Sequence, residues 1–195
     1  MMKNNIFTLL IILTVLSCKQ KTEPKILSKA EVKVIKKDTF LCTNGYDFPV
    51  GKPDSKGYYN AQKFTENEHL GEDWNAVTGG DSDLGDPIFA IANGYVSFAE
   101  NIQGGWGNII RVVHHNNEND LVESLYAHCD TIYVKEKDYV TKGQQIGTIG
   151  NNDGQYLAHL HLELRSTIGM PVGGGYSSNT EGYLNPTEYI KNNRK

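Results

Sequence analysis

The segment from residue 157 to residue 165 alternates between apolar and polar side chains, which is the period of a β-strand. One face carries polar residues and the other apolar ones: His159, His161, Glu163 and Arg165 against Ala158, Leu160, Leu162 and Leu164. We expect the apolar face to be the buried one. The two imidazoles lie about 7 Å apart at their Cα atoms, because a strand rises roughly 3.3 Å per residue. One can therefore bind a metal while its neighbour points at a substrate.

Short runs with strand character recur from about Leu41 and are separated by Gly, Asn and Asp. They cover residues 87–92, 95–99, 109–114, 122–128, 145–149 and 157–165. Turn signals at this spacing are typical of an all-β protein, so we expect one all-β domain over residues 41–195. The Gly-rich stretches at 79–80, 104–105 and 173–175 are expected to be loops, because no helical pattern follows them.

The only good helix signal is at the end of the chain. Asn185 is a capping residue, Pro186 suits the first turn, and Glu188 places an acid three residues after the cap. The pattern predicts a short C-terminal helix that reaches about Asn192.

The first 17 residues have the features of an export signal: an early lysine, an apolar run from Ile6 to Leu16, and a small residue at the end. The run is about half the roughly 20 residues that a membrane-spanning helix needs. Val15-Leu16-Ser17-Cys18 resembles the lipobox of bacterial lipoproteins, in which cleavage leaves the cysteine first and lipid is attached to it. We expect lipidated Cys18 to anchor the protein to a membrane. A plain signal with an incidental cysteine is the alternative.

Residues 18–40 are rich in lysine and poor in aromatic residues, which is typical of a solvated tether. The whole chain has a net charge of −4, but eight of its 19 basic residues and only three of its 23 acidic residues precede Thr39. The remainder therefore carries a net charge of −9. An acidic domain argues against nucleic acid as the partner.

His69 and Asp73 are four residues apart, with Gly71 between them. In an extended segment this even spacing presents both side chains on one side, and glycine permits a close approach to an ion. Zinc that performs catalysis commonly takes three ligands from His, Asp or Glu and keeps a fourth position for water. His69, Asp73 and one of the two late histidines would supply such a set.

The same alternation in Tyr126-Ala127-His128 places Tyr126 and His128 on one face, and Ala127 and Cys129 on the other. Cys129 is therefore expected to pack inward. An exported location permits a disulfide between Cys129 and Cys42, but the sequence does not show that the two are close enough.

With these motifs the chain resembles the lysostaphin-type (LytM-domain) zinc metallopeptidases, which cut peptides of peptidoglycan. The resemblance runs from about residue 48 to residue 161. Its carriers are His69-Leu70-Gly71-Glu72-Asp73, residues 85–90, Gly94-Tyr95-Val96, Gly107-Asn108, Tyr126-Ala127-His128, residues 140–147 and His159-Leu160-His161. The departures are small: Cys129 stands where the family usually has Leu, and Leu157-Ala158 where it has Gly-Pro.

The resemblance implies a groove on an antiparallel β-sheet of the barrel-sandwich (duplicated hybrid motif) type. His69, Asp73 and His161 match the family's ligands for one Zn²⁺, and His128 and His159 match its catalytic histidines. The implied function is a metalloendopeptidase that cuts peptidoglycan cross-links or stem peptides in the cell envelope, at the outer membrane or the periplasmic face. The bond that is cut and the choice of general base stay open.

Other polar residues allow alternatives. Glu163 and Tyr126 are candidates to orient the ligands from behind, and Glu163 suits a solvated salt bridge equally well. His114 and His115 match no ligand position, so we expect them to be structural residues at a strand end. The alternative function is a non-catalytic LytM-type domain that binds the wall or activates another hydrolase. Such domains typically lack one or more of the five site residues.

Overall fold

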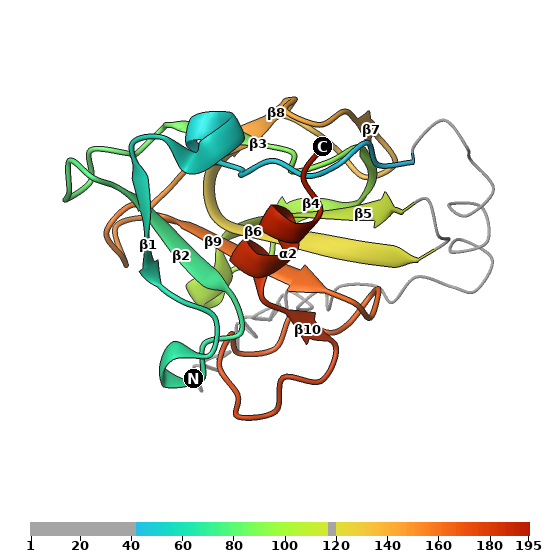
Figure 1. The fold of residues 1–195 in the computed structure, drawn as a ribbon. Helices are drawn as coiled ribbons and strands as arrows, with labels where there is room; N and C mark the ends of the chain where they lie inside the picture. Colours follow the sequence, from blue (N-terminus) through green and yellow to red (C-terminus); the bar gives the residue numbers. More distant parts are fainter. Residues whose placement is uncertain (1–41, 117–119) are drawn as a thin grey trace, which may run out of the picture.

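The computed structural model describes residues 42–116 and 120–195, and within them it forms one sheet of ten strands (Figure 1). The strands are β1 (Tyr58–Gln62), β2 (Glu72–Ala76), β3 (Pro87–Phe89), β4 (Gly94–Asn101), β5 (Asn108–His115), β6 (Leu121–Ile132), β7 (Tyr139–Val140), β8 (Gln145–Ile149), β9 (Leu160–Arg165) and β10 (Tyr183–Leu184).

Every pair of neighbouring strands in this sheet is antiparallel. The order is β1-β2-β9-β6-β5-β4-β7, with β10 beside β9, and β8 between β6 and β3. The predicted all-β antiparallel fold is therefore confirmed. Strands β1, β2, β7 and β10 were not expected as such, because they are short or carry few apolar residues.

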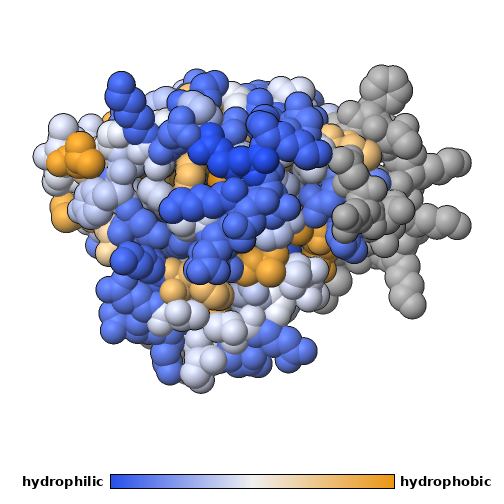
Figure 2. Space-filling model, in the orientation of Figure 1, coloured by the Kyte–Doolittle hydropathy of each residue, from blue (hydrophilic) through white to orange (hydrophobic). Residues whose placement is uncertain are grey.

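The predicted C-terminal helix is present as α2 (Pro186–Asn192), and the Asn185 side chain accepts a hydrogen bond from the Glu188 N–H at 3.1 Å. Three single turns complete the helical segments that the structure describes: η2 (Gly51–Ser55), η3 (Glu66–Glu68) and η4 (Gly104–Trp106). The Thr187 hydroxyl of α2 donates to the buried carboxylate of Glu72 in β2 at 2.8 Å. The helix is thereby held against the face of the sheet, beside β2 and β9 (Figure 1), and the side of the molecule that carries it is largely hydrophilic (Figure 2).

The main core lies on one side of β9, where Leu160, Leu162 and Leu164 are fully buried. Other members of this core come from most of the remaining elements, among them Phe48, Trp74, Ile88, Val112, Tyr126, Ile146 and Ile190. The expectation that this face of the strand is buried is confirmed.

The opposite face of β9 is also buried, which was not expected. His161, Glu163 and Arg165 are at most 4% exposed. Glu163 therefore makes no solvated salt bridge. The loop between β9 and β10 covers this face, since the Arg165 guanidinium donates to the carbonyls of residues 170, 171 and 172. A contact between segments of this kind leaves no trace in the local sequence pattern.

A β-bulge changes the alternation within β6. Asn108 pairs with Cys129 and Ile110 pairs with Tyr126, so Ala127 and His128 together oppose one residue of β5. As a result Tyr126 and Cys129 both pack in the main core. The prediction that Tyr126 shares a face with His128 is wrong, because the regular period ends at the bulge. The inward packing of Cys129 is confirmed.

Cys42 and Cys129 are free thiols. The backbone of Cys42 forms a β-bridge with His115 at one end of β5. Cys129 instead pairs with Asn108 at the other end of the same strand. A strand of this length separates the two cysteines by about 20 Å, which excludes a disulfide between them.

No helix within residues 42–116 and 120–195 is long and apolar enough to span a membrane. The expected signal at residues 1–17, lipidated Cys18 and the tether at 18–40 lie outside the described residues.

His114 is a structural residue, as expected, and it is fully buried in β5. Its Nδ1–H donates to the Asn93 carbonyl at 3.0 Å, and Nε2 accepts from the Ser124 hydroxyl at 2.7 Å. Burial lowers the pKa of His114 to about 4, against the opposing effect of the Asn93 hydrogen bond. The folded protein therefore holds this imidazole neutral.

We expect His114→Gln to make the stability less sensitive to acid. The pKa of His114 in the folded protein lies below its unfolded value near 6.5. Its contribution to the free energy of unfolding is therefore fully present above pH 6.5 and is lost as pH falls toward 4. Between pH 7 and pH 4.5, protonation of His114 should lower the free energy of unfolding of the wild-type protein by about 2.5 kcal/mol. Urea unfolding at both pH values, under one metal condition, measures the difference. Equal losses in the two proteins would show that His114 does not cause the acid sensitivity.

Candidate functional site

The pairing of β2 with β9 brings two predicted ligands together, because Asp73 lies directly opposite His161. Oδ1 of Asp73 is 2.9 Å from Nδ1 of His161. His69 enters from the extended segment that follows η3, and its Nε2 is 3.0 Å from His161 Nδ1 and 3.5 Å from Asp73 Oδ1. Among the described residues these three form the one group of acidic, His or Cys side chains that could hold a metal ion.

The three donor atoms fit a single cation. Ligands of a tetrahedral zinc at 2.0–2.2 Å would be about 3.3 Å apart, and the observed separations of 2.9, 3.0 and 3.5 Å bracket that value. Burial on its own would raise the pKa of Asp73, but the hydrogen bond and charge of His161 leave it below its usual value. The Asp73 carboxylate is therefore ionised, as a metal ligand would need to be.

Glu163 contacts the ring of His161 from behind. Its Oε1 is 3.3 Å from Nε2 of His161, and both side chains are buried. Although burial raises the pKa of Glu163, the contacts with His161 and Arg165 lower it below the usual value, so the carboxylate is ionised. Burial lowers the pKa of His161, but the contacts with Asp73 and Glu163 raise it to about 9, so without a metal ion both ring nitrogens carry a proton. Loss of the Nδ1 proton would leave Nε2–H donating to Glu163 and the Nδ1 lone pair facing Asp73 and His69. Tyr126 has no such contact, since its hydroxyl accepts from the Ile91 N–H in the core.

Gly71 allows the segment that carries His69 and Asp73 to pass close to His161. A Cβ at this position would lie 2.8 Å from Cε1 and Nε2 of His161 and 2.7 Å from the Leu162 carbonyl oxygen. Real Cβ atoms essentially never approach backbone so closely. Gly71 therefore allows a close approach to the His161 imidazole, while the expected close approach to an ion stays a prediction.

His128 reaches the site because of the bulge in β6. Its φ of 57° is left-handed, which is uncommon for a residue other than glycine and typical of functional sites. The ring centroid lies 4.7 Å from that of His159 and 5.8 Å from that of His161. Burial, together with the neighbouring His161 and His159, lowers the pKa of His128 to about 3. The imidazole is therefore neutral at pH 7.

His159 lies immediately before β9 and is held by its backbone and by its ring. Its Nδ1–H donates to the Leu157 carbonyl at 2.7 Å, which leaves Nε2 as the acceptor. Nε2 is 3.9 Å from Oδ1 of Asp73, on the side of the metal ligands. The five predicted site residues thus meet in one place.

These residues line a cavity of about 440 Å³, together with aromatic and glycine residues that the sequence analysis did not identify. The additional lining residues are Gly105, Trp106, Tyr156, Gly174, Gly175 and Tyr176. The Trp106 ring is 5.3 Å from that of His161, and the Tyr176 ring is 5.1 Å from that of His69. In the sequence, the only sign that Trp106 and Tyr176 line a cavity was their position directly after the Gly-rich stretches at 104–105 and 173–175.

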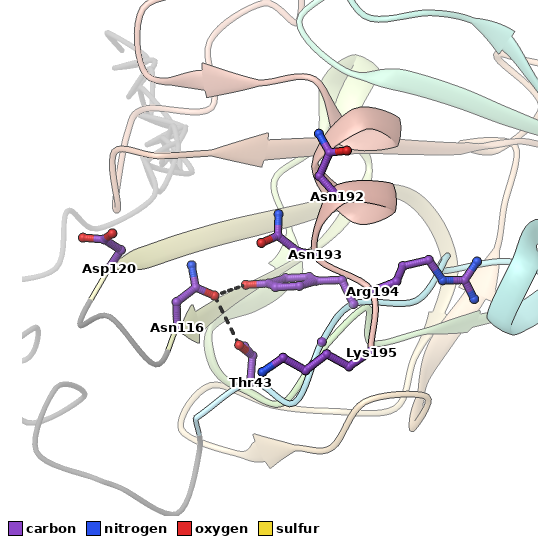
Figure 3. Close-up of a pocket in the computed structure, with 9 residues that line it drawn as sticks. Thr43, Asn116, Asp120, Asn192, Asn193, Arg194 and Lys195 are labelled. Carbon is purple, nitrogen blue, oxygen red and sulfur yellow. Dashed lines mark hydrogen bonds between the residues drawn. The ribbon is translucent and has the colours of Figure 1, made fainter.

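A second hollow, of about 290 Å³, lies beside α2 (Figure 3). Asn116 is among the residues that line it, and its Oδ1 accepts from the Tyr46 hydroxyl at 2.8 Å and from the Thr43 hydroxyl at 3.2 Å. No histidine lines it, and the hydroxyls of Thr43 and Tyr46 are both hydrogen-bonded to Asn116. The first cavity is therefore the candidate active site.

Gly71→Ala is expected to weaken zinc binding at least about tenfold, because the new methyl group displaces the His161 ring from its carboxylate partner. We also expect a loss of about 1–3 kcal/mol in stability. Gly174→Ala is the matched control, since a Cβ there meets nothing within 4 Å. Competition with a chromophoric chelator gives the affinity, and urea unfolding gives the stability. Equal zinc affinity in the two variants would rule out this role of Gly71.

Part of this chain is similar to known bacterial proteins. Lipoprotein NlpD of Yersinia enterocolitica is 46% identical over 81 residues, which are 42% of this chain and 78% of that protein. The murein hydrolase activator NlpD of Escherichia coli K12 is 42% identical over 81 residues, again 42% of this chain but only 20% of that protein.

Among solved structures, a point mutant of the catalytic domain of the prophage-encoded M23 protein EnpA from Enterococcus faecalis has the same fold. The TM-score is 0.52 at 23% identity, over 74% of this chain and 97% of that one. The model of Peptidase family M23 matches residues 67–174, a span that includes all five site residues. Because this match takes in more than half of the sequence, the chain belongs to Peptidase family M23.

Proposed function

We propose that this protein is a zinc-dependent endopeptidase that hydrolyses peptide bonds in peptidoglycan. The observation that carries the proposal is the convergence of three metal-binding atoms within 3.5 Å of one another, beside two further imidazoles, in one open cavity. A site for structural metal would be closed by a fourth protein ligand. This site instead has space for a substrate.

His69 Nε2, Asp73 Oδ1 and His161 Nδ1 are the atoms that would hold the zinc ion. When bound, zinc polarises a carbonyl group and lowers the pKa of a coordinated water toward about 7. Glu163 keeps the His161 ring in the tautomer that offers Nδ1.

His159 is the proposed proton acceptor. Because its Nδ1–H is engaged by the Leu157 carbonyl, Nε2 is free to take the proton of the attacking water. Its distance of 3.9 Å from Asp73 Oδ1 places Nε2 beside the ligands. The same atom then holds the proton that the leaving amine needs.

His128 is the proposed hydrogen-bond donor to the developing oxyanion. The surrounding imidazoles and its burial keep it neutral, so it carries one N–H and does not compete for the water proton. The bulge fixes its position relative to His159, with the ring centroids 4.7 Å apart.

The cell wall as substrate is supported by the family and by the names of the relatives, which refer to murein and to lipoproteins. The export signal and Cys18 support a lipid anchor in a bacterial envelope, with residues 18–40 as the tether. The bond cut within the wall is left to experiment.

A second function has support from the name of the E. coli relative, a murein hydrolase activator. In that case the groove would bind wall peptides or a partner hydrolase without cutting. The presence of all five residues in one geometry favours hydrolysis.

We expect the purified protein to bind one equivalent of zinc and to release new amino groups from isolated cell walls, and a chelator should abolish the release. His161→Ala should lose both metal and activity. His128→Gly should keep the metal but lose at least about 100-fold in kcat, since it removes only a proton-handling group. Glycine is chosen because it accepts the left-handed backbone at this position.

Metal analysis and an amine-labelling assay of digested walls separate the outcomes. Loss of zinc in His128→Gly would contradict the division of roles. Bound zinc with no cleavage of any wall, but with stimulation of an added wall hydrolase by both the wild-type protein and His128→Gly, would replace the peptidase proposal with the activator function.

A further inference from the structure

Two of the three arginines in the chain, Arg111 and Arg165, are buried behind the metal ligands. Nε of Arg111 donates to Glu123 at 2.8 Å, and Nε of Arg165 donates to Glu163 at 2.8 Å. All four side chains are at most 2% exposed. Apolar residues of similar volume are often as stable as buried ion pairs, so stability alone does not account for this cluster.

Both guanidinium groups also hold the backbone of one loop. Arg165 donates to three consecutive carbonyl oxygens, those of residues 170, 171 and 172, at 3.2, 3.3 and 3.2 Å. Arg111 donates to the carbonyl of residue 170 at 3.0 Å, and Glu123 accepts from the N–H of residue 169 at 3.2 Å. Arginine suits this task because its planar group has five donors in a rigid arrangement.

The residues that follow immediately form a wall of the active-site cavity. Gly174, Gly175 and Tyr176 line it, and the Gly173 carbonyl accepts from Nε1 of Trp106 at 2.9 Å. The Gly175 carbonyl accepts from the Leu70 N–H at 2.9 Å, next to His69. The cavity wall of residues 173–176 therefore begins where the arginine contacts end.

We propose that Arg165 is a positioning residue that sets both the metal ligand His161 and the cavity wall at 173–176. One guanidinium group holds the Glu163 carboxylate, which contacts His161, and the carbonyls that precede the wall. Displacement of either partner is therefore transmitted to the other. The proposal rests on the proposed function only in taking His161 as a zinc ligand.

Arg165→Lys tests this in the full-length protein, because lysine keeps the charge but cannot reach the carboxylate and three carbonyls together. We expect zinc affinity to fall about 10–100-fold. The Leu70 N–H donates to the Gly175 carbonyl, and the Ser177 N–H donates to the Glu68 carbonyl. Hydrogen exchange of these two amides should be roughly ten times faster in Arg165→Lys than in the wild-type protein, with or without zinc. Chelator competition and amide exchange measured by NMR provide the two readouts.

Two other arginine variants are matched controls. Arg111 contacts the same loop, but its carboxylate partner is Glu123 and not Glu163. In Arg111→Lys, amide exchange at Leu70 and Ser177 should therefore accelerate, while zinc affinity should stay within about threefold of the wild-type value. Arg194→Lys, at an exposed ion pair with Asp54, should change neither readout. Wild-type values in Arg165→Lys, or an equal loss of zinc affinity in Arg111→Lys, would overturn the proposal.

If Arg165→Lys does not fold, Glu163→Gln tests the same connection, since it keeps an oxygen for His161 but weakens the hold of Arg165. Lower zinc affinity together with faster exchange at Leu70 and Ser177 supports the proposal, and unchanged values refute it. A wild-type protein that binds zinc but cuts no wall peptide refutes the proposed function alone, because neither readout depends on hydrolysis.

Discussion

The register of three strands, β2, β9 and β6, is the constraint on which the rest of the site depends. It places Asp73 opposite His161, and His161 opposite Ala127, in one row across the sheet. A slip of one residue would turn His161 into the main core and bring a leucine to the ligand position. The leucines of β9 prevent that slip, because each is fully buried only in the observed register. Hydrophobic packing on one face therefore determines the geometry of the candidate metal-binding group on the other.

The row is supported from both sides. On the side of the main core, the carboxylate of Glu72 accepts from Thr187 and connects the strand of Asp73 to α2. On the opposite side, ionised Glu163 connects His161 to a buried arginine. Ligands fixed from behind in this way need little rearrangement to bind an ion, which is the usual purpose of such outer contacts.

Much of this arrangement could be predicted from local patterns. The two-residue period identified β9 and the faces of its side chains, and the spacing of His69 and Asp73 suited one cation. The errors have a common physical origin, which is contact between distant segments. Burial of the polar face of β9 depends on a loop that follows the strand, and nothing within the strand encodes that cover. The wall residue Tyr176 belongs to the same loop.

The bulge in β6 is the clearest structural feature that the two-residue period of the sequence could not predict. The period of two predicted Tyr126 and His128 on one face, but Tyr126 lies in the core, and a regular strand would have turned His128 toward the core as well. The inserted residue reverses the alternation, so His128 faces the groove while Cys129 packs inside. If the same residues paired regularly after Tyr126, His128 would turn toward the core, whereas the three candidate metal-binding side chains come from other segments and would stay in place. The local pairing of β6 therefore positions His128 independently of His69, Asp73 and His161, so the two parts of the candidate site can change separately.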